Sequence, residues 1–535
     1  MTTRTSRVAG WAIIACSALL LFARLGHYAL WGDEAGTALV AKGVLRTFDT
    51  SALVDDHNIF ADDNGNQLRN LHERYVPPLQ SYLAAPSLAV FGQESAWAAR
   101  LPFALCGLAT IILILWWAWR EEVRWEFGLL LGMGLVCNVS LLLYSRQCRY
   151  YSAALLCSVA VAWLYLRWNG RRGGLVAMAG LLSCLLALNY LNYIALCVCL
   201  AADYAVWGRR ERRLAVPDWL WLLLIQAVVG VIVFCIWNPF ALRGGVPEPS
   251  NWLVNKLTLF WWNWRDLNRC EFGALVLLVL APLLYPWLRD RWLLRAPLAL
   301  LIYVAATTLC SPQQVDITSD ADVRYLVPVI PLCIAIGMLT LCTLTRKVPW
   351  VAIPLGVLAF GTNSFQGGPL AYCGFRSTLA NYIGELINPP GDPYMVTARW
   401  INEHVRNGES VWALPNPAPY PLMFHAPKAI YAWQLTEPAE PQFALLPPIH
   451  FQKRKAPDYV IAFGPGLTEM VNTLRDWNRP EVQYEQVAMI DHFWGNVYSP
   501  ELYWRTFKPV TNYNRKTEAI YVFKRVTPPA ANMDR

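Results

Sequence analysis

The segment Trp31-Gly32-Asp33-Glu34-Ala35-Gly36 directly follows a largely apolar run over residues 8–30, and this arrangement decides how the chain is organised. A run of about 20 apolar residues crosses the hydrocarbon core of a bilayer as a helix. A carboxylate at the end of such a helix is costly to desolvate unless it has a partner or a function. We therefore take Asp33 and Glu34 as candidate functional residues at the mouth of a first membrane span.

Apolar runs of similar length recur along most of the chain, which is 56% hydrophobic and only 15% charged over its 535 residues. They predict an all-α polytopic membrane bundle of about 11 transmembrane helices. The predicted spans lie near residues 8–30, 97–119, 126–144, 151–167, 174–190, 191–207, 218–237, 272–287, 296–310, 325–345 and 348–366. A large soluble protein would have to bury most of these runs in one core, so we reject that alternative.

The basic residues predict the orientation, because Lys and Arg are held on the cytoplasmic side of a membrane. Arginines precede the first span and fill every second connection after it, as in 209–213 and 289–295. This pattern places the N-terminus in the cytoplasm, and Asp33 and the residues after about 367 outside. The net charge of +8 reflects this topology, so we expect membrane lipids and no nucleic acid as partners. The predicted outer regions lack Asn-x-Ser/Thr sites, which favours a bacterial plasma (inner) membrane.

Two domains are expected. A transmembrane domain covers residues 1–366 and includes a long polar first outer loop over 31–96 and a second outer loop near 238–271. The second loop is rich in Trp, which suits a segment at the membrane interface. A small extracytoplasmic α/β domain covers residues 367–535, with strands over 410–414, 459–463 and 518–523 and helices over 397–407 and up to Trp477. Cys270 and Cys373 are both expected outside the membrane and could form a disulfide.

The residues after the acidic pair have helical periodicity, because Ala35, Leu39, Leu45 and Phe48 recur on roughly one face. This pattern predicts a helix that lies along the membrane surface. Asp33 then stands at or near its N-cap, where a carboxylate accepts backbone N–H bonds. Alternatively, Asp33 is a general base that faces an external cavity. Both interpretations can hold, because capping fixes the orientation of the carboxylate.

Arginines at the predicted outer ends of spans suggest an anion site. Arg146 and Arg149 share a helical face in the connection 144–151, at the positive end of the next helix, where a phosphate held by guanidinium groups would compensate them. Snorkelling to lipid headgroups is the alternative. Arg324 opens another span after the acidic loop 316–322, where it could instead pair with a nearby Asp.

A further cluster precedes Pro77-Pro78, which starts a helix at its first turn. It places His72 and Arg74 close to the membrane surface, although an isolated His of this kind is more often structural than catalytic.

These residues together resemble a known family. The resemblance rests on Asp33-Glu34, Pro77-Pro78-Leu79, Phe91-Gly92, Trp97-Ala98-Ala99-Arg100-Leu101-Pro102, Ser145-Arg146 with Arg149-Tyr150, and Arg324-Tyr325-Leu326-Val327-Pro328, in this order. The chain is similar to the GT-C membrane glycosyltransferases, in the branch of the protein O-mannosyltransferases and the lipid A aminoarabinose transferase. The resemblance covers about the first 366 residues, and the outer α/β domain is compatible with it.

The resemblance implies an inverting glycosyltransferase that moves a sugar from a polyprenyl-phosphate donor to an acceptor (protein, lipid or glycan) outside the membrane. It implies catalytic Asp33 and Glu34, donor-phosphate-binding Arg146, Arg149, Arg324 and Arg74, and substrate-binding His72, Tyr150 and Tyr325. If the acceptor is itself a phosphate, no base is needed and Asp33 positions the acceptor. A transporter or flippase of lipid-linked sugars and a non-catalytic family member are the alternatives.

The sequence departs from the family pattern in two places. Val76 stands immediately before Pro-Pro-Leu, where relatives often carry Lys or His, and Gln147 and Cys148 occupy the second outer region in which relatives often have a carboxylate. A mechanism that needs a second carboxylate for a metal is therefore not predicted. We predict no metal and no other cofactor, and a divalent metal stays an open alternative.

Overall fold

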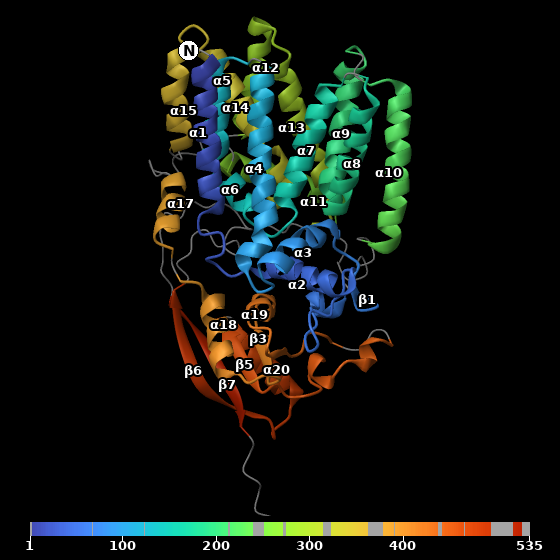
Figure 1. Cartoon of the computed structure of the whole chain (residues 1–535), viewed down its shortest axis with the longest axis vertical. Coiled ribbons are helices and arrows are strands. Elements are labelled where there is room, and N and C mark those ends of the chain that lie inside the picture. The colour runs from blue at the N-terminus through green and yellow to red at the C-terminus, as the bar shows by residue number, and fades with distance from the viewer. Residues whose placement is uncertain are drawn as a thin grey trace, which may run out of the picture.

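The computed structural model describes residues 3–66, 68–121, 123–168, 170–211, 214–238, 251–270, 274–313, 323–361, 378–389, 391–436, 441–464, 466–493 and 517–526. A helical bundle forms one end of the molecule and a small β-sheet forms the other, with the N-terminus at the end of the bundle far from the sheet (Figure 1). The predicted combination of a helical bundle with a C-terminal α/β part is therefore confirmed.

The bundle is built from apolar helices whose buried side chains form one large hydrophobic cluster. Its helices are α1 (Thr3–Phe22), α4 (Ala96–Arg120), α5 (Trp125–Cys137), α6 (Val139–Ser145), α7 (Tyr151–Leu166), α8 (Arg172–Leu188), α9 (Tyr190–Asp203) with η2 (Tyr204–Gly208), α10 (Val216–Ile236), α11 (Trp252–Cys270), α12 (Ala274–Leu288), α13 (Trp292–Cys310), η4 (Val323–Val329) with α14 (Ile330–Leu344), η5 (Pro349–Val351) and α15 (Ala352–Gly361).

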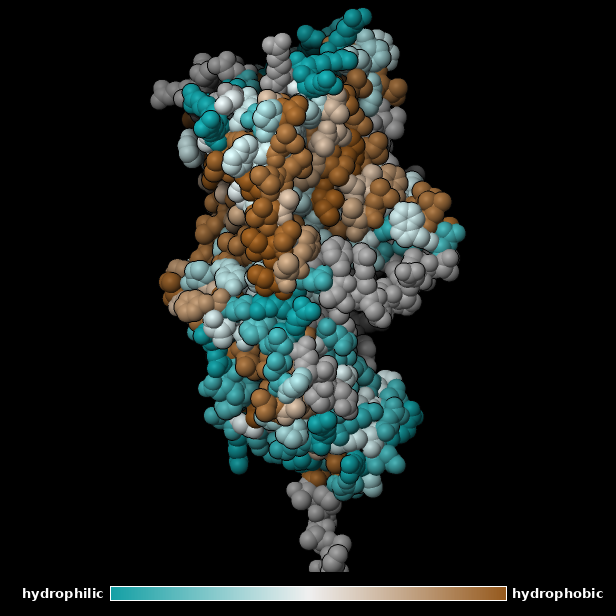
Figure 2. Space-filling model, turned by 90° about the vertical axis from the view of Figure 1, so that its right-hand side faces the viewer, coloured by the Kyte–Doolittle hydropathy of each residue, from teal (hydrophilic) through white to brown (hydrophobic). Residues whose placement is uncertain are grey.

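Length and composition identify membrane spans among the described residues. Five helical segments are long and apolar enough to cross a bilayer, and α5 with α6, which meet at an angle of 59°, make a sixth if the bent pair is one span. Figure 2 shows a broad hydrophobic surface on the bundle, with hydrophilic residues beyond it at both ends. The chain is thus a multi-pass membrane protein, while the predicted number of about 11 spans stays a prediction.

The second outer loop predicted near 238–271 contains the helix α11. Its polar side packs on the C-terminal end of α13, where Lys256 Nζ donates to the carbonyls of Thr308 and Ser311. Trp261 is exposed on the opposite side of the helix and Trp252 is exposed at its first residue, which suits contact with lipid. Residues 239–250 of this loop lie outside the described residues.

The first outer loop places two helices across the end of the bundle: α2 (Gly32–Thr47) and α3 (Leu79–Phe91) (Figure 1). The predicted helix is confirmed. Trp31 is its N-cap and Asp33 lies in the first turn, near the N-cap as predicted. The placement of this helix along the membrane surface stays a prediction, but its apolar face is covered by protein. Ala35 and Leu39 are fully buried because other parts of the chain cover α2, whereas Phe48, just after the helix, is strongly exposed. The loop also contains η1 (Asp62–Gly65), β1 (Leu68–Arg69) and β2 (His72–Glu73).

The C-terminal part is a five-stranded sheet in the order β4-β3-β5-β7-β6. Its strands are β3 (Ser410–Leu414), β4 (Ile430–Tyr431), β5 (Tyr459–Phe463), β6 (Gln483–Phe493) and β7 (Thr517–Val526); β3, β4 and β5 are parallel, and β7 pairs antiparallel with β5 and β6. Its helices are α17 (Thr378–Ile387), α18 (Pro393–His404), α19 (Pro419–His425), η6 (Phe443–Leu445), η7 (Pro448–His450) and α20 (Gly466–Trp477).

All three predicted strands are present, and the helix predicted over 397–407 begins four residues earlier and ends three residues earlier. It begins earlier because the Asp392 side chain accepts the Met395 N–H, and Pro393 occupies the first turn. The predicted domain boundary at 366 and Cys373 lie outside the described residues, as does the side chain of Cys270, so the predicted disulfide stays a prediction.

The first outer loop and the C-terminal sheet share a hydrophobic core. Leu39 of α2 and Phe60 of the loop belong to the same buried cluster as Phe424 of α19 and Val411 of β3. The ring of Phe60 lies edge-on to that of Tyr420, with centroids 4.9 Å apart. The C-terminal part is therefore packed directly against the helix that carries Asp33.

Candidate active site

Asp33 and Glu34 point into different surroundings, as expected for neighbours about 100° apart around a helix. The Glu34 side chain is fully buried, whereas 34% of the Asp33 side chain is exposed. The acidic pair is thus divided between one carboxylate enclosed in protein and one that solutes can reach.

Glu34 forms a buried ion pair with Arg100 of α4. Arg100 Nη2 lies 2.6 Å from Glu34 Oε2 and Arg100 Nε lies 2.9 Å from Oε1, which also accepts the Cys148 N–H at 2.6 Å. Arg100 donates further to the carbonyls of Leu25, Tyr28 and Ala29. These contacts tie the start of α2 to α4 and to the connection between α6 and α7.

Asp33 is shared by two arginines from distant segments. Arg324 Nη1 of η4 lies 2.6 Å from Asp33 Oδ2, and Arg149 Nη2 of the α6–α7 connection lies 3.4 Å from the same oxygen. Arg149 also donates to Thr37 Oγ1, one turn further along α2, at 3.2 Å. We call Asp33, Arg149 and Arg324 the Asp33 cluster, and it carries a net charge of one positive unit.

The electrostatics of the cluster favour an ionised carboxylate. Burial acts to raise the pKa of Asp33, but the positive charges of Arg149 and Arg324 outweigh it and hold that pKa below its usual range. The same pairing raises the pKa of Arg149 against the opposing effect of burial. Asp33 is therefore ionised and Arg149 protonated at neutral pH.

Unsatisfied polar atoms surround the cluster. The Arg149 guanidinium lies over the ring of Tyr150 at 5.8 Å, and that of Arg324 lies over Tyr325 at 5.3 Å. Among the residues that the structure describes, the buried atoms Arg149 Nε and Tyr150 Oη have no hydrogen-bond partner. Buried polar groups normally find a partner, so these atoms suit a polar ligand.

Arg146 lies away from the cluster. Its guanidinium donates to the carbonyls of Leu20 and Ala23 at 2.7 Å and to Tyr382 Oη of α17 at 2.8 Å. Carbonyls at a helix C-terminus need outside donors, and Arg146 meets this need at the end of α1. It is therefore placed to join α1 to α17.

Arg74 and His72 form a second group around Asp49. Arg74 makes a two-pronged contact with Asp49 at 2.7 and 2.6 Å, and His72 Nε2 lies 3.6 Å from Asp49 Oδ2. The hydrogen bond from Arg74 contributes most to lowering the pKa of Asp49, to about 2. Arg74 also lies 5.4 Å from the ring of Trp237, at the end of α10.

Glu73 is a buried carboxyl that the sequence did not single out. Its Oε1 accepts the N–H groups of Tyr75 and Val76, which fixes the turn that leads into α3. Its Oε2 is buried and has no partner among the described residues. Burial raises the pKa of Glu73 to about 7, against the lowering effect of these backbone hydrogen bonds and of the Arg149 charge.

Within the described parts of the chain, no three His, Cys, Asp or Glu side chains gather as they would around a metal ion.

The C-terminal part holds the backbone just before Asp33. The Ala29 N–H donates to Asp392 Oδ2 at 3.2 Å, and the Leu30 N–H donates to His425 Nε2 at 3.3 Å. A Cβ atom on Gly32 would lie only 2.5 Å from Pro417 Cγ, so glycine is needed for this close approach. Sequence reasoning missed these contacts because they join residues more than 360 positions apart.

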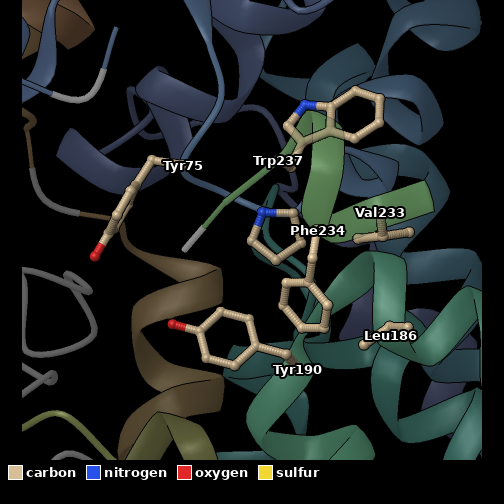
Figure 3. A pocket seen from close by; sticks show the side chains of 7 residues that line it. Tyr75, Leu186, Tyr190, Val233, Phe234 and Trp237 are labelled. Atoms are coloured by element: carbon tan, nitrogen blue, oxygen red, sulfur yellow. The ribbon is translucent and has the colours of Figure 1, made fainter. Parts of the chain in front are cut away.

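A small apolar pocket lies between α8, α9, α10 and the turn before α3. It is lined by Tyr75, Pro77, Leu186, Tyr190, Val233, Phe234 and Trp237 (Figure 3). About 220 Å³ of empty space lies within it, including space open to solvent. Trp237 connects this pocket to the Asp49 group through its contact with Arg74 and a hydrogen bond from its indole N–H to Thr50.

Comparison with known proteins shows similarity in fold and none in sequence. No protein-family model matches the chain, and no curated protein matches its sequence. Among solved structures, the chain is similar to ArnT from Cupriavidus metallidurans bound to undecaprenyl phosphate, with a TM-score of 0.55 and 14% identity over 96% of this chain and 98% of that one. The apo form of the same protein gives a TM-score of 0.54 and 15% identity over the same shares of both chains.

A weaker similarity links the chain to the archaeal oligosaccharyltransferase AglB from Archaeoglobus fulgidus in complex with an inhibitory peptide and a dolichol-phosphate. Its TM-score is 0.42, with 10% identity over 88% of this chain and 71% of that one. The likeness to ArnT extends over nearly the whole of both chains and shows that this chain has the fold of that protein. The resemblance inferred from the sequence is therefore confirmed for the fold.

Proposed function

We propose that this protein is an inverting glycosyltransferase that moves a sugar from a polyprenyl-phosphate donor to an acceptor on the non-cytoplasmic side of a membrane. The convergence of Asp33, Arg149 and Arg324 on one partly exposed site carries this proposal. It supplies one carboxylate that can act on an acceptor and two guanidinium groups that can bind a phosphate. The GT-C fold, shared with a protein whose structure holds undecaprenyl phosphate, supports it.

In the proposed reaction Asp33 takes the proton of an acceptor hydroxyl, and the acceptor oxygen attacks the anomeric carbon. The bond from that carbon to the donor phosphate breaks, and its electron pair leaves with the phosphate oxygen. Arg149 and Arg324 stabilise the negative charge that develops there. If the acceptor is a phosphate, which already carries a nucleophilic oxygen, Asp33 positions it instead.

The remaining candidate residues take other roles in this proposal. Glu34 positions Asp33 through its buried pair with Arg100, and Arg146 fastens α1 to α17. Tyr150 and Tyr325, whose rings lie beside the two arginines, are proposed to contact the substrate. The apolar pocket at Trp237 suits the first part of a prenyl chain, and Arg74 and His72 stand beside this path.

The purified protein, incubated with radiolabelled polyprenyl-phosphate sugars and a membrane extract, tests this proposal. We expect the label to move from the lipid to an acceptor, with release of polyprenyl phosphate. Movement of intact donor across a vesicle membrane without release would identify a transporter or flippase. Binding of the donor without either event would identify a non-catalytic member of the fold.

A further inference from the structure

Asp33 binds its two arginines through a single carboxylate oxygen. Asp33 Oδ2 accepts from Arg324 at 2.6 Å and lies 3.4 Å from Arg149. Of the three side chains, Asp33 is 34% exposed, Arg324 22% and Arg149 16%, so the cluster can be reached from solvent. The Glu34–Arg100 pair, at 0% and 8%, is closed.

We propose that, without the donor, Asp33 occupies the position between Arg149 and Arg324 that the donor phosphate takes when it binds. This inference rests on the proposed function and adds an order of events to it. The donor must bind first, because its phosphate displaces Asp33 from the arginines and leaves the carboxylate free to meet the acceptor.

Competition between the two anions follows from their chemistry. A guanidinium group presents its N–H donors equally well to a carboxylate and to a phosphate. Two anions on the same guanidinium groups repel each other, so a bound phosphate weakens the contacts that Asp33 makes with them.

The exchange also changes how readily Asp33 accepts a proton. The two arginines hold the pKa of Asp33 below its usual range, and a carboxylate with so low a pKa takes up a proton poorly. Once the arginines contact the phosphate, burial remains, and burial raises the pKa of a carboxyl group. The proton of the acceptor hydroxyl then passes to Asp33 while the electron pair of the broken bond stays on the phosphate, next to Arg149 and Arg324.

Binding of undecaprenyl phosphate to the purified full-length protein in detergent tests this inference. Asp33→Asn removes the competing charge, so we expect it to bind this lipid tighter than the natural protein, by roughly tenfold or more, although transfer is lost. Asp33→Ala removes the same charge with a smaller side chain and serves as a second variant. Asp56→Asn is the control: its carboxylate is on the same loop, pairs with Arg46 at 2.7 Å and is 82% exposed, so affinity should not change.

The outcomes separate this inference from the proposed function. Equal or weaker binding of undecaprenyl phosphate by both Asp33 variants would overturn the exchange and leave the proposed function standing. If the natural protein and its variants all fail to bind the lipid while they remain folded, both ideas fail. Tighter binding with loss of transfer supports both.

Discussion

Arg324 and Arg146 can be compared directly. The sequence predicted the same phosphate-binding role for both, but the structure gives them different partners. Arg324 lies 2.6 Å from Asp33 in a site open to solvent, whereas Arg146 donates to two backbone carbonyls at the end of α1 and to Tyr382. We expect Arg324→Gln to impair transfer and Arg146→Gln to impair the stability of the fold.

The magnitude follows from the contact that each variant removes. A hydrogen bond to a charged group contributes about 1.5–3 kcal/mol. If Arg324 holds the leaving phosphate more strongly in the transition state than in the ground state, its loss lowers kcat by about 10- to 150-fold, since each 1.36 kcal/mol is a factor of ten. Loss of the Arg146 contacts leaves the carbonyls of Leu20 and Ala23 without this donor and lowers the free energy of unfolding by about 1–3 kcal/mol.

Two measurements on the purified variants make the comparison: the initial rate of label transfer per folded molecule, and the temperature of unfolding in detergent. Arg324→Gln should lose rate and keep the unfolding temperature close to that of the natural protein. Arg146→Gln should unfold at a lower temperature and keep the rate per folded molecule. The reasoning is refuted if Arg146→Gln loses as much rate as Arg324→Gln at equal folded concentration.

Three further predictions concern the surroundings of Asp33. Glu34→Gln leaves the buried Arg100 charge unpaired, so it should lower the free energy of unfolding by about 3–5 kcal/mol and clearly lower the unfolding temperature. An unchanged unfolding temperature would contradict a structural role for this pair. Gly32→Ala should lower kcat because the new Cβ would lie 2.5 Å from Pro417, and the double variant with Pro417→Ala should recover part of the rate. If the double variant recovers nothing, this contact does not position Asp33. Burial raises the pKa of Glu73 from 4.5 to about 7, so protonated Glu73 should stabilise the fold below pH 4.5, and about 3 kcal/mol of this contribution should be lost as the pH rises to 7. Glu73→Gln should flatten the dependence of the unfolding temperature on pH, and an unchanged pH profile in this variant would contradict the prediction.

Local pattern was sufficient for several parts of the structure. The apolar runs predicted the helical bundle, and alternation with turn residues predicted β3, β5 and β7. The acidic pair after the first span and the arginines at span ends pointed to Asp33, Arg149 and Arg324 together, which the structure places in contact. The sequence could do this because charges at a membrane boundary are costly, and their positions are therefore informative.

Local sequence pattern could not predict the contacts between distant segments. The carboxyl pair could not be divided into buried Glu34 and accessible Asp33, because this depends on where Arg100 of α4 packs. The apolar face of α2 looked like a membrane-binding face because the sequence does not show that α19 covers the helix. Arg146 and Arg149, three residues apart, looked equivalent, although one meets the end of α1 and the other meets Asp33.

The rate of sugar transfer by the Asp33→Asn protein tests the central claim most directly. The variant keeps the size of the side chain and removes its negative charge, and Asp56→Asn makes the same change at an exposed surface pair. We predict that Asp33→Asn lowers the rate from a polyprenyl-phosphate donor by about 10²- to 10⁴-fold, the usual contribution of a general base, while Asp56→Asn transfers at the natural rate. Transfer by Asp33→Asn to a hydroxyl acceptor at a rate near that of the natural protein would contradict the account.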